Sequence, residues 1–136
     1  YTVLGGSAGD AAWLTSLNPR YGTALLVTEP TRLAAHDRLV FREVDRVQAP
    51  QGPSEVVFEL VGFKRKVSEE QRALVEAYEQ ALALFRDRQF ELAAAKFATC
   101  AVELKDPLSE RYRVRCHQLL ASPPSPGWAG ALFDST

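Results

Sequence analysis

The first 14 residues of the chain have the arrangement of an active-site element whose working side chains are missing. An apolar strand over residues 1–4 runs into a glycine-rich turn and then into an alanine-rich helix. On that helix Gly9 offers only its backbone N–H and Trp13 a single uncharged indole donor, so neither supplies an acid, a base or a charge. The sequence opens inside the strand without a methionine, and we therefore expect it to begin within a domain.

These residues resemble the class III nucleotidyl cyclases. The family's catalytic domain carries a Tyr-(Thr or Asp)-x-x-Gly strand end, a short loop and an Asn-x-x-x-Arg pair on the following helix, and residues 1–5 here read Tyr-Thr-Val-Leu-Gly. Residues 21–28 are similar to the family's next strand, residues 41–47 to the strand before its terminal hairpin, and residues 55–60 to its last strand. The similarity covers residues 1 to about 63, roughly the C-terminal half of such a domain, and its specificity lies in the ordered set.

The resemblance implies a role for three positions. Thr2 falls where the family reads the purine, and a hydroxyl is common there in ATP-using bacterial-type members. The asparagine that orients the ribose falls on Gly9, and the arginine that binds the phosphate falls on Trp13. A fixed amide and a bidentate guanidinium are both lost, and the loop residue that is commonly aspartate is Gly6. The resemblance therefore implies a degenerate active site with no intact catalytic residue.

The resemblance also implies which cofactors and partners the segment needs. Class III cyclases work as head-to-tail dimers in which one half supplies metal-binding aspartates and the other supplies the purine contacts, the asparagine and the arginine. The aspartates would precede residue 1, so we expect no cofactor here, and Mg²⁺ or Mn²⁺ would act with ATP only if the missing half-domain completed the site. We expect the segment to be inactive alone and to form a homo- or heterodimer with a cyclase domain.

Composition argues against several classes of function. The 136 residues carry a net charge of −1 with cations and anions interspersed, which leaves no basic stripe for nucleic acid. No apolar run is long enough to span a membrane and no signal segment opens the chain, so we expect no membrane contact in this segment, although a longer parent could be anchored upstream. Cys100 and Cys116 lack metal-ligand spacing and are expected to be buried thiols in the reducing cytoplasm.

Hydrophobic periodicity predicts an α+β fold. Residues 1–66 form the C-terminal half of a cyclase-like domain, a partial ferredoxin-like sheet with a β-hairpin around a Pro/Gly turn. The charges that cluster at residues 42–46 are expected to be solvated or paired across strands. After the first strand we expect a helix that Asp10 caps and Asn18-Pro19 stops, followed by a strand over residues 24–27. A short helix over residues 28–36 and two hairpin strands over residues 39–48 and 55–61 are expected next.

Residues 67–122 change to helical periodicity. Ser68 with Gln71 behind it predicts a helix start, and a polar break at 86–89 separates a second helix that Pro107 closes. A third helix is expected over 108–121, with Leu120 on its buried stripe. The buried stripes of the first two helices are predicted at Leu74, Tyr78, Ala81, Leu82, Phe85, Phe90, Ala93, Ala94, Phe97, Cys100 and Leu104.

The first two of these helices resemble a tetratricopeptide repeat (TPR). Ala93, Phe97 and Cys100 are near the repeat's small, large and small positions, although the first helix lacks the usual Trp and Gly. Only one repeat and a trailing helix are visible, whereas repeat arrays need about three to bury a continuous core. We therefore expect the helices to pack on something else, either the sheet or a second copy of the chain.

Residues 123–136 form a proline-rich tail that cannot adopt regular structure. Two interpretations of its aromatic residues stay open. Trp128 folds back onto the helices, or Trp128 and Phe133 act as partner anchors, since aromatic residues carry much interface energy.

Two functions follow, together with a simpler alternative. The first is a degenerate cyclase domain in cyclic AMP signalling, catalytically incompetent, that acts in dimerisation and regulation and uses its helices for protein contacts. The second is the metal-donor half of an active heterodimeric adenylate cyclase. The third is a TPR-like interaction module with vestigial strands. The replacements at Gly9 and Trp13 favour the first, because they remove groups that would stabilise the transition state.

Overall fold

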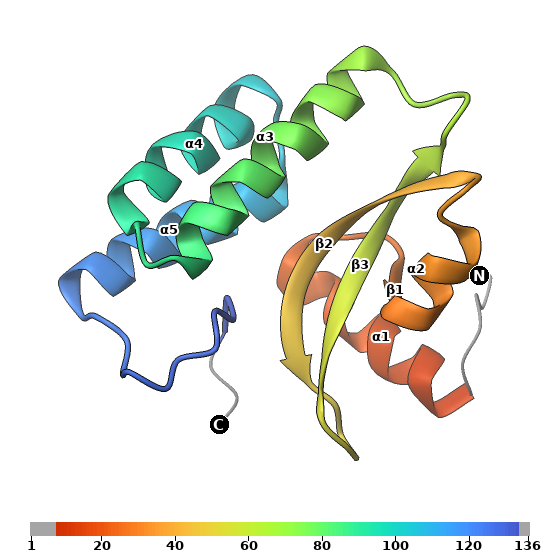
Figure 1. Ribbon diagram of the computed structural model, residues 1–136, viewed down its shortest axis with the longest axis horizontal. Helices are drawn as coiled ribbons and strands as arrows, with labels where there is room; N and C mark the ends of the chain where they lie inside the picture. Colours follow the sequence, from red (N-terminus) through yellow and green to blue (C-terminus); the bar gives the residue numbers. More distant parts are fainter. Residues whose placement is uncertain (1–7, 134–136) are drawn as a thin grey trace. The chain divides into compact units, whose positions relative to one another are not determined.

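The computed structural model describes residues 8–133 and has an α+β fold, as the periodicity predicts (Figure 1). The chain divides into two compact units between Val67 and Ser68. We call residues 8–67 the sheet unit and residues 68–133 the helical unit and describe each by itself. The sequence placed the boundary between residues 66 and 67, one position before the division in the structure.

The sheet unit contains a three-stranded antiparallel sheet in the order β1-β3-β2. β2 and β3 form the predicted hairpin around the turn that contains Gly52, whose φ of 124° is one that L side chains rarely adopt. β2 has the predicted bounds, while β1 and β3 are each displaced or longer by one or two residues. The elements are α1 (Ala8–Tyr21), β1 (Leu26–Thr28), α2 (Glu29–Ala35), β2 (Leu39–Gln48) and β3 (Ser54–Phe63).

The predicted bounds of α1 are wrong at both ends. The helix begins at Ala8, so Asp10 lies in the first turn and not at the N-cap, and it runs through Pro19 to Tyr21. Proline has a poor helix propensity, but tertiary packing outweighs it here. The continued helix places Tyr21 in the core, where the residue is only 1% exposed. Gly22 then ends the helix with a φ of 69°, and its N–H donates to the Asn18 carbonyl at 2.8 Å.

Buried polar groups link α1 to the sheet. The Tyr21 hydroxyl donates to Oδ2 of Asp45 at 2.7 Å, and Oδ1 of the same carboxylate accepts the backbone N–H of Arg46 at 2.8 Å. Asp45 on β2 is fully buried, beside an irregularity in the β2–β3 register. Burial first, and then the Asp45 carboxylate, raise the pKa of the Tyr21 hydroxyl. The pair therefore fixes where α1 meets β2.

The charges on β2 only partly meet the expectation. Arg42 is paired across strands as expected, since its Nε donates to Oε1 of Glu59, its register partner on β3, at 2.9 Å. Asp45 meets neither alternative, because it is fully buried and accepts from Tyr21 of α1. Alternation along the strand could not reveal this, because the register irregularity changes which residues share a face.

The helical unit consists of α3 (Glu69–Arg86), α4 (Phe90–Glu103) and α5 (Pro107–Ala121). The capping box predicted at Ser68 is present: its hydroxyl accepts the Gln71 N–H, and the Gln71 side chain accepts the Ser68 N–H. Asp106 caps α5 by accepting the Ser109 N–H at 3.1 Å. The two cap interactions fix where α3 and α5 begin.

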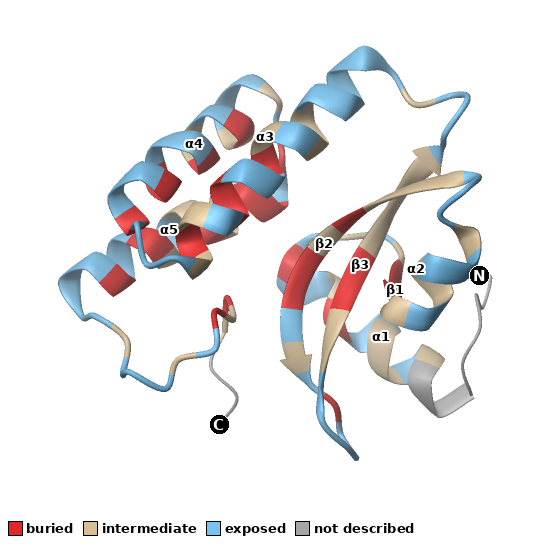
Figure 2. Ribbon diagram, in the orientation of Figure 1, coloured by how far each residue is buried: buried red, intermediate tan, exposed pale blue. Residues whose placement is uncertain are grey.

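Aromatic rings fill the core of the helical unit. Figure 2 shows buried residues recurring about once per turn of α4, with exposed residues between them. The predicted stripes of α3 and α4 are buried except for Leu74 and Leu104, which are half-buried. On α5 the prediction is wrong for Leu120, which is 47% exposed, because the buried stripe follows Leu108, Tyr112, Cys116 and Leu119.

Replacing Tyr21 by Phe is expected to destabilise the sheet unit by about 1–3 kcal/mol, because the buried Asp45 carboxylate loses one of its donors. Urea unfolding followed by Trp13 fluorescence, in a Trp128→Phe background, reports on the sheet unit alone. Asp37→Asn is the matched control, since its side chain is 71% exposed and its pairing with Arg38 is long at 3.9 Å. Equal effects of the two substitutions would show that the Tyr21–Asp45 bond carries no net stability.

Candidate functional site

The positions implied by the cyclase resemblance lie at the start of α1. Gly9 is in the first turn of this helix and Trp13 is one turn later, half-buried. Residues four apart on a helix share a face, so the two positions adjoin. Thr2 and Gly6 lie outside the described residues. The described part of this site contains no amide, carboxylate or guanidinium at positions 9 and 13.

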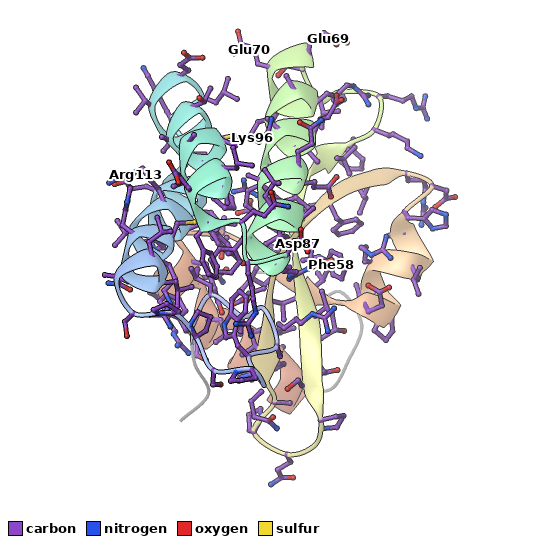
Figure 3. The ribbon with its side chains drawn as sticks, turned by 60° about the vertical axis from the view of Figure 1, so that its left-hand side comes forward. Phe58, Glu69, Glu70, Asp87, Lys96 and Arg113 are labelled. Carbon is purple, nitrogen blue, oxygen red and sulfur yellow. The ribbon has the colours of Figure 1, made fainter. Side chains whose placement is uncertain are left out.

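The helical unit has an open groove between α3 and α4, with a volume of about 550 Å³. Ala83 and Leu84 of α3 provide apolar surface, and Lys96 of α4 contributes a cation. Its Nζ donates to Oε1 of Gln80 at 3.3 Å. Asp87, the residue that caps the C-terminus of α3, adds an anion; Figure 3 shows Lys96 on α4 and Asp87 at the end of α3.

The groove is open to solvent. Its volume falls in the range of ligand pockets, but it is open, so it would leave much of a small ligand in water. The Asp87 carboxylate is already an acceptor for the Gln89 amide, and the groove offers no nucleophile with a base beside it. An apolar side chain of a protein segment, flanked by charges, would match the lining.

Trp128 folds back onto the helices, as one of the two interpretations proposes. Its ring packs edge-on against Phe85 with centroids 5.2 Å apart and against Phe90 at 5.6 Å. The indole N–H donates to the Ala131 carbonyl at 3.3 Å. The second anchor candidate, Phe133, is half-buried.

Arg88, in the turn between α3 and α4, is a contact residue that the sequence did not reveal. Its guanidinium lies over the Trp128 ring, 5.4 Å from the centroid, and donates to the carbonyls of Pro124 at 3.2 Å and Ser125 at 2.6 Å. The only sequence signal was a polar break between two helices, and a break of this kind predicts a solvated turn. The contact spans 36 residues of chain and leaves no local pattern.

Both cysteines are buried thiols, as predicted, and neither is in a disulfide within the described residues. Burial raises the pKa of the Cys116 thiol to about 12, because the thiolate would lose its hydration. Neither cysteine therefore has the features of a catalytic nucleophile, which needs a lowered pKa and some exposure.

Residues 8–133 are the part of the chain that the structure describes. No group of three or more His, Cys, Asp or Glu side chains is gathered there in a way that could hold a metal ion. Within the same range, no helix has both the length and the apolar character needed to cross a bilayer.

Comparison with protein-family models, with curated proteins and with solved structures finds no match for this chain.

Thiol labelling tests the burial of both cysteines. At pH 8 we expect Ellman's reagent to modify Cys100 and Cys116 only when urea unfolds the protein, since the native Cys116 thiol stays protonated up to about pH 12. An unfolded thiol ionises near pH 8.5, so the contribution of Cys116 to stability is complete below that pH and declines as pH rises towards 12. Rapid labelling of both thiols without denaturant would contradict the burial.

Proposed function

We propose that this chain is a catalytically incompetent part of a class III nucleotidyl cyclase-like protein, acting in dimerisation and regulation in cyclic AMP signalling. The support is the ordered set of similar segments over residues 1 to about 63, together with the replacements at Gly9 and Trp13. We further propose that it acts in the cytoplasm, where two buried thiols would remain reduced.

The continuity of α1 is the observation that carries the proposal. Because the helix runs unbroken from Ala8 to Tyr21, positions 9 and 13 adjoin as an asparagine and arginine pair would have to. A continuous helix supports this assignment, and neither position carries a group that would stabilise phosphoryl charge. Loss of a single preorganised donor costs about 10²–10³ in rate in well-studied enzymes, so loss of both argues for a role without catalysis.

The helical unit supports the regulatory half of the proposal. The groove between α3 and α4 is apolar along Ala83 and Leu84, with the opposite charges of Asp87 and Lys96 at its border. Such a surface suits a protein segment, as helical hairpins of the TPR kind do. Partners would then meet the chain in two places, a cyclase domain at the sheet unit and a protein segment at the groove.

The first test is activity and pairing. The purified chain with ATP and Mg²⁺ or Mn²⁺ should form no cyclic AMP, because positions 9 and 13 hold glycine and tryptophan. When it is mixed with a catalytically active class III adenylate cyclase domain, sedimentation should reveal a mixed dimer and the rate of cyclic AMP formation should change. Product from the chain alone would overturn the claim of incompetence, and an unpaired chain with an unchanged rate would overturn the regulatory role.

The second test restores the missing groups. The double variant Gly9→Asn, Trp13→Arg should raise cyclic AMP formation when it is mixed with a cyclase domain that keeps its metal-binding aspartates but lacks its own asparagine and arginine. The gain should reach about 10²-fold, the effect of one regained donor. The double variant Leu33→Asn, Leu92→Arg, made at exposed positions outside α1, is the control and should give no gain. No gain from either variant would argue against the assignment of positions 9 and 13.

A further inference from the structure

The tail is a folded ligand of the helical unit rather than a loose end. Residues 125–128 form a turn around Pro126 and Gly127, in which the Trp128 N–H donates to the Ser125 carbonyl at 3.1 Å. The indole N–H bonds within the tail, to the Ala131 carbonyl. The segment therefore satisfies its own indole donor and presents a ring with no unpaired polar group.

Arg88 recognises the backbone of this turn. Its two terminal nitrogens bind consecutive carbonyls, those of Pro124 and Ser125, and its guanidinium plane covers the Trp128 ring. Carbonyls next to prolines are strong acceptors that no sheet or helix uses, and arginine is the side chain whose planar fork can bind two of them while it stacks on a ring. The contact reads a proline-rich, tryptophan-containing backbone and depends little on the other side chains.

The backbone of Arg88 is an independent sign of this role. Its φ of 64° lies in the left-handed region, at the position after a helix where glycine is usual. The capping bonds of this turn are present, with the Gln89 N–H donating to the Leu84 carbonyl at 2.9 Å. Glycine would make the same backbone bonds with less strain, so the benefit of arginine here lies in its side chain, which contacts the tail.

The tail contacts the helical unit closely at a few residues. Phe85 and Phe90 receive the Trp128 ring, and Gly130 approaches Arg86 so closely that an added Cβ would lie 2.9 Å from Arg86 Cγ. Gly130 also has a φ of 89°. By contrast, Ser122 and Pro123, which tether the tail to α5, are exposed. The tail is thus anchored at Trp128 and Gly130, while Ser122 and Pro123 stay exposed.

We propose that Phe85 of α3, Arg88 of the following turn and Phe90 of α4 form a recognition site for a proline-rich segment that carries tryptophan. Each molecule fills this site with its own tail. The site can also accept the tail of a second copy of the chain. Exchange of this kind needs no new surface, because the bonds made in trans are those already made in cis. The tether of prolines keeps the free tail extended and so lowers the entropy lost on docking. This proposal is independent of the resemblance to cyclases.

The test adds the tail as a separate labelled peptide with the sequence of residues 122–133 and measures its binding by fluorescence anisotropy. The full chain carrying Gly130→Ala is the receptor, because the added methyl displaces the chain's own tail without altering the site. We expect saturable binding to this variant and about tenfold or weaker binding to the unmodified chain, whose tail competes at high effective concentration. A peptide with Trp128 replaced by alanine should not bind.

Arg88 supplies the matched controls. In the Gly130→Ala chain, Arg88→Ala should weaken peptide binding about tenfold, and Arg88→Lys should do so nearly as much, since an amine cannot bind two carbonyls and stack. Trp128→Ala replaces Gly130→Ala as the receptor if circular dichroism shows the latter unfolded. The proposal would be overturned if the peptide bound the unmodified chain as tightly as the receptor variant, or if it bound neither the Gly130→Ala nor the Trp128→Ala chain. It would also be overturned if substitution of Arg88 left the peptide's affinity unchanged.

Discussion

The helical unit depends on the packing of one side chain, Phe85. Its ring meets Tyr112 of α5 edge-on at 5.0 Å and Phe90 of α4 at 5.6 Å, so a residue of α3 holds both other helices. Edge-to-face geometry places positive ring edges on negative ring faces, which makes these contacts directional as well as apolar. The same ring receives Trp128, and the tail thereby becomes part of the unit's packing.

This cluster explains how so short a helical segment can have a core. A TPR-like hairpin leaves apolar surface that further repeats would cover, and the sequence suggested that the sheet or a second copy had to cover it. Within the helical unit, Phe97 stacks on Tyr112 with centroids 4.9 Å apart, and Trp128 adds a ring from outside the helices. Large rings bury much area per residue, so these few residues form a core within the unit.

Most of the helical unit could be predicted from sequence, whereas the sheet unit and the tail could be predicted only in outline. Helical stripes and the Ser68 cap are local patterns with a fixed period, and they were largely correct. The predicted end of α1 was wrong. Pro19 is a local signal that predicts a stop, whereas the buried Tyr21–Asp45 bond, which favours a longer helix, joins residues 24 apart in sequence. The contacts of Arg88 were missed for the same reason, since its partners are remote in sequence, whereas the packing of Trp128 on the helices was one of two interpretations.

The positions at the start of α1 and the residues that hold α1 in place are different. Gly9 and Trp13 lie in the first two turns of the helix, whereas Leu17 and Tyr21 are buried near its end. The Tyr21–Asp45 bond and the Gly22 cap stabilise α1 whatever occupies positions 9 and 13. A change at either early position therefore leaves the Tyr21–Asp45 bond and the Gly22 cap in place.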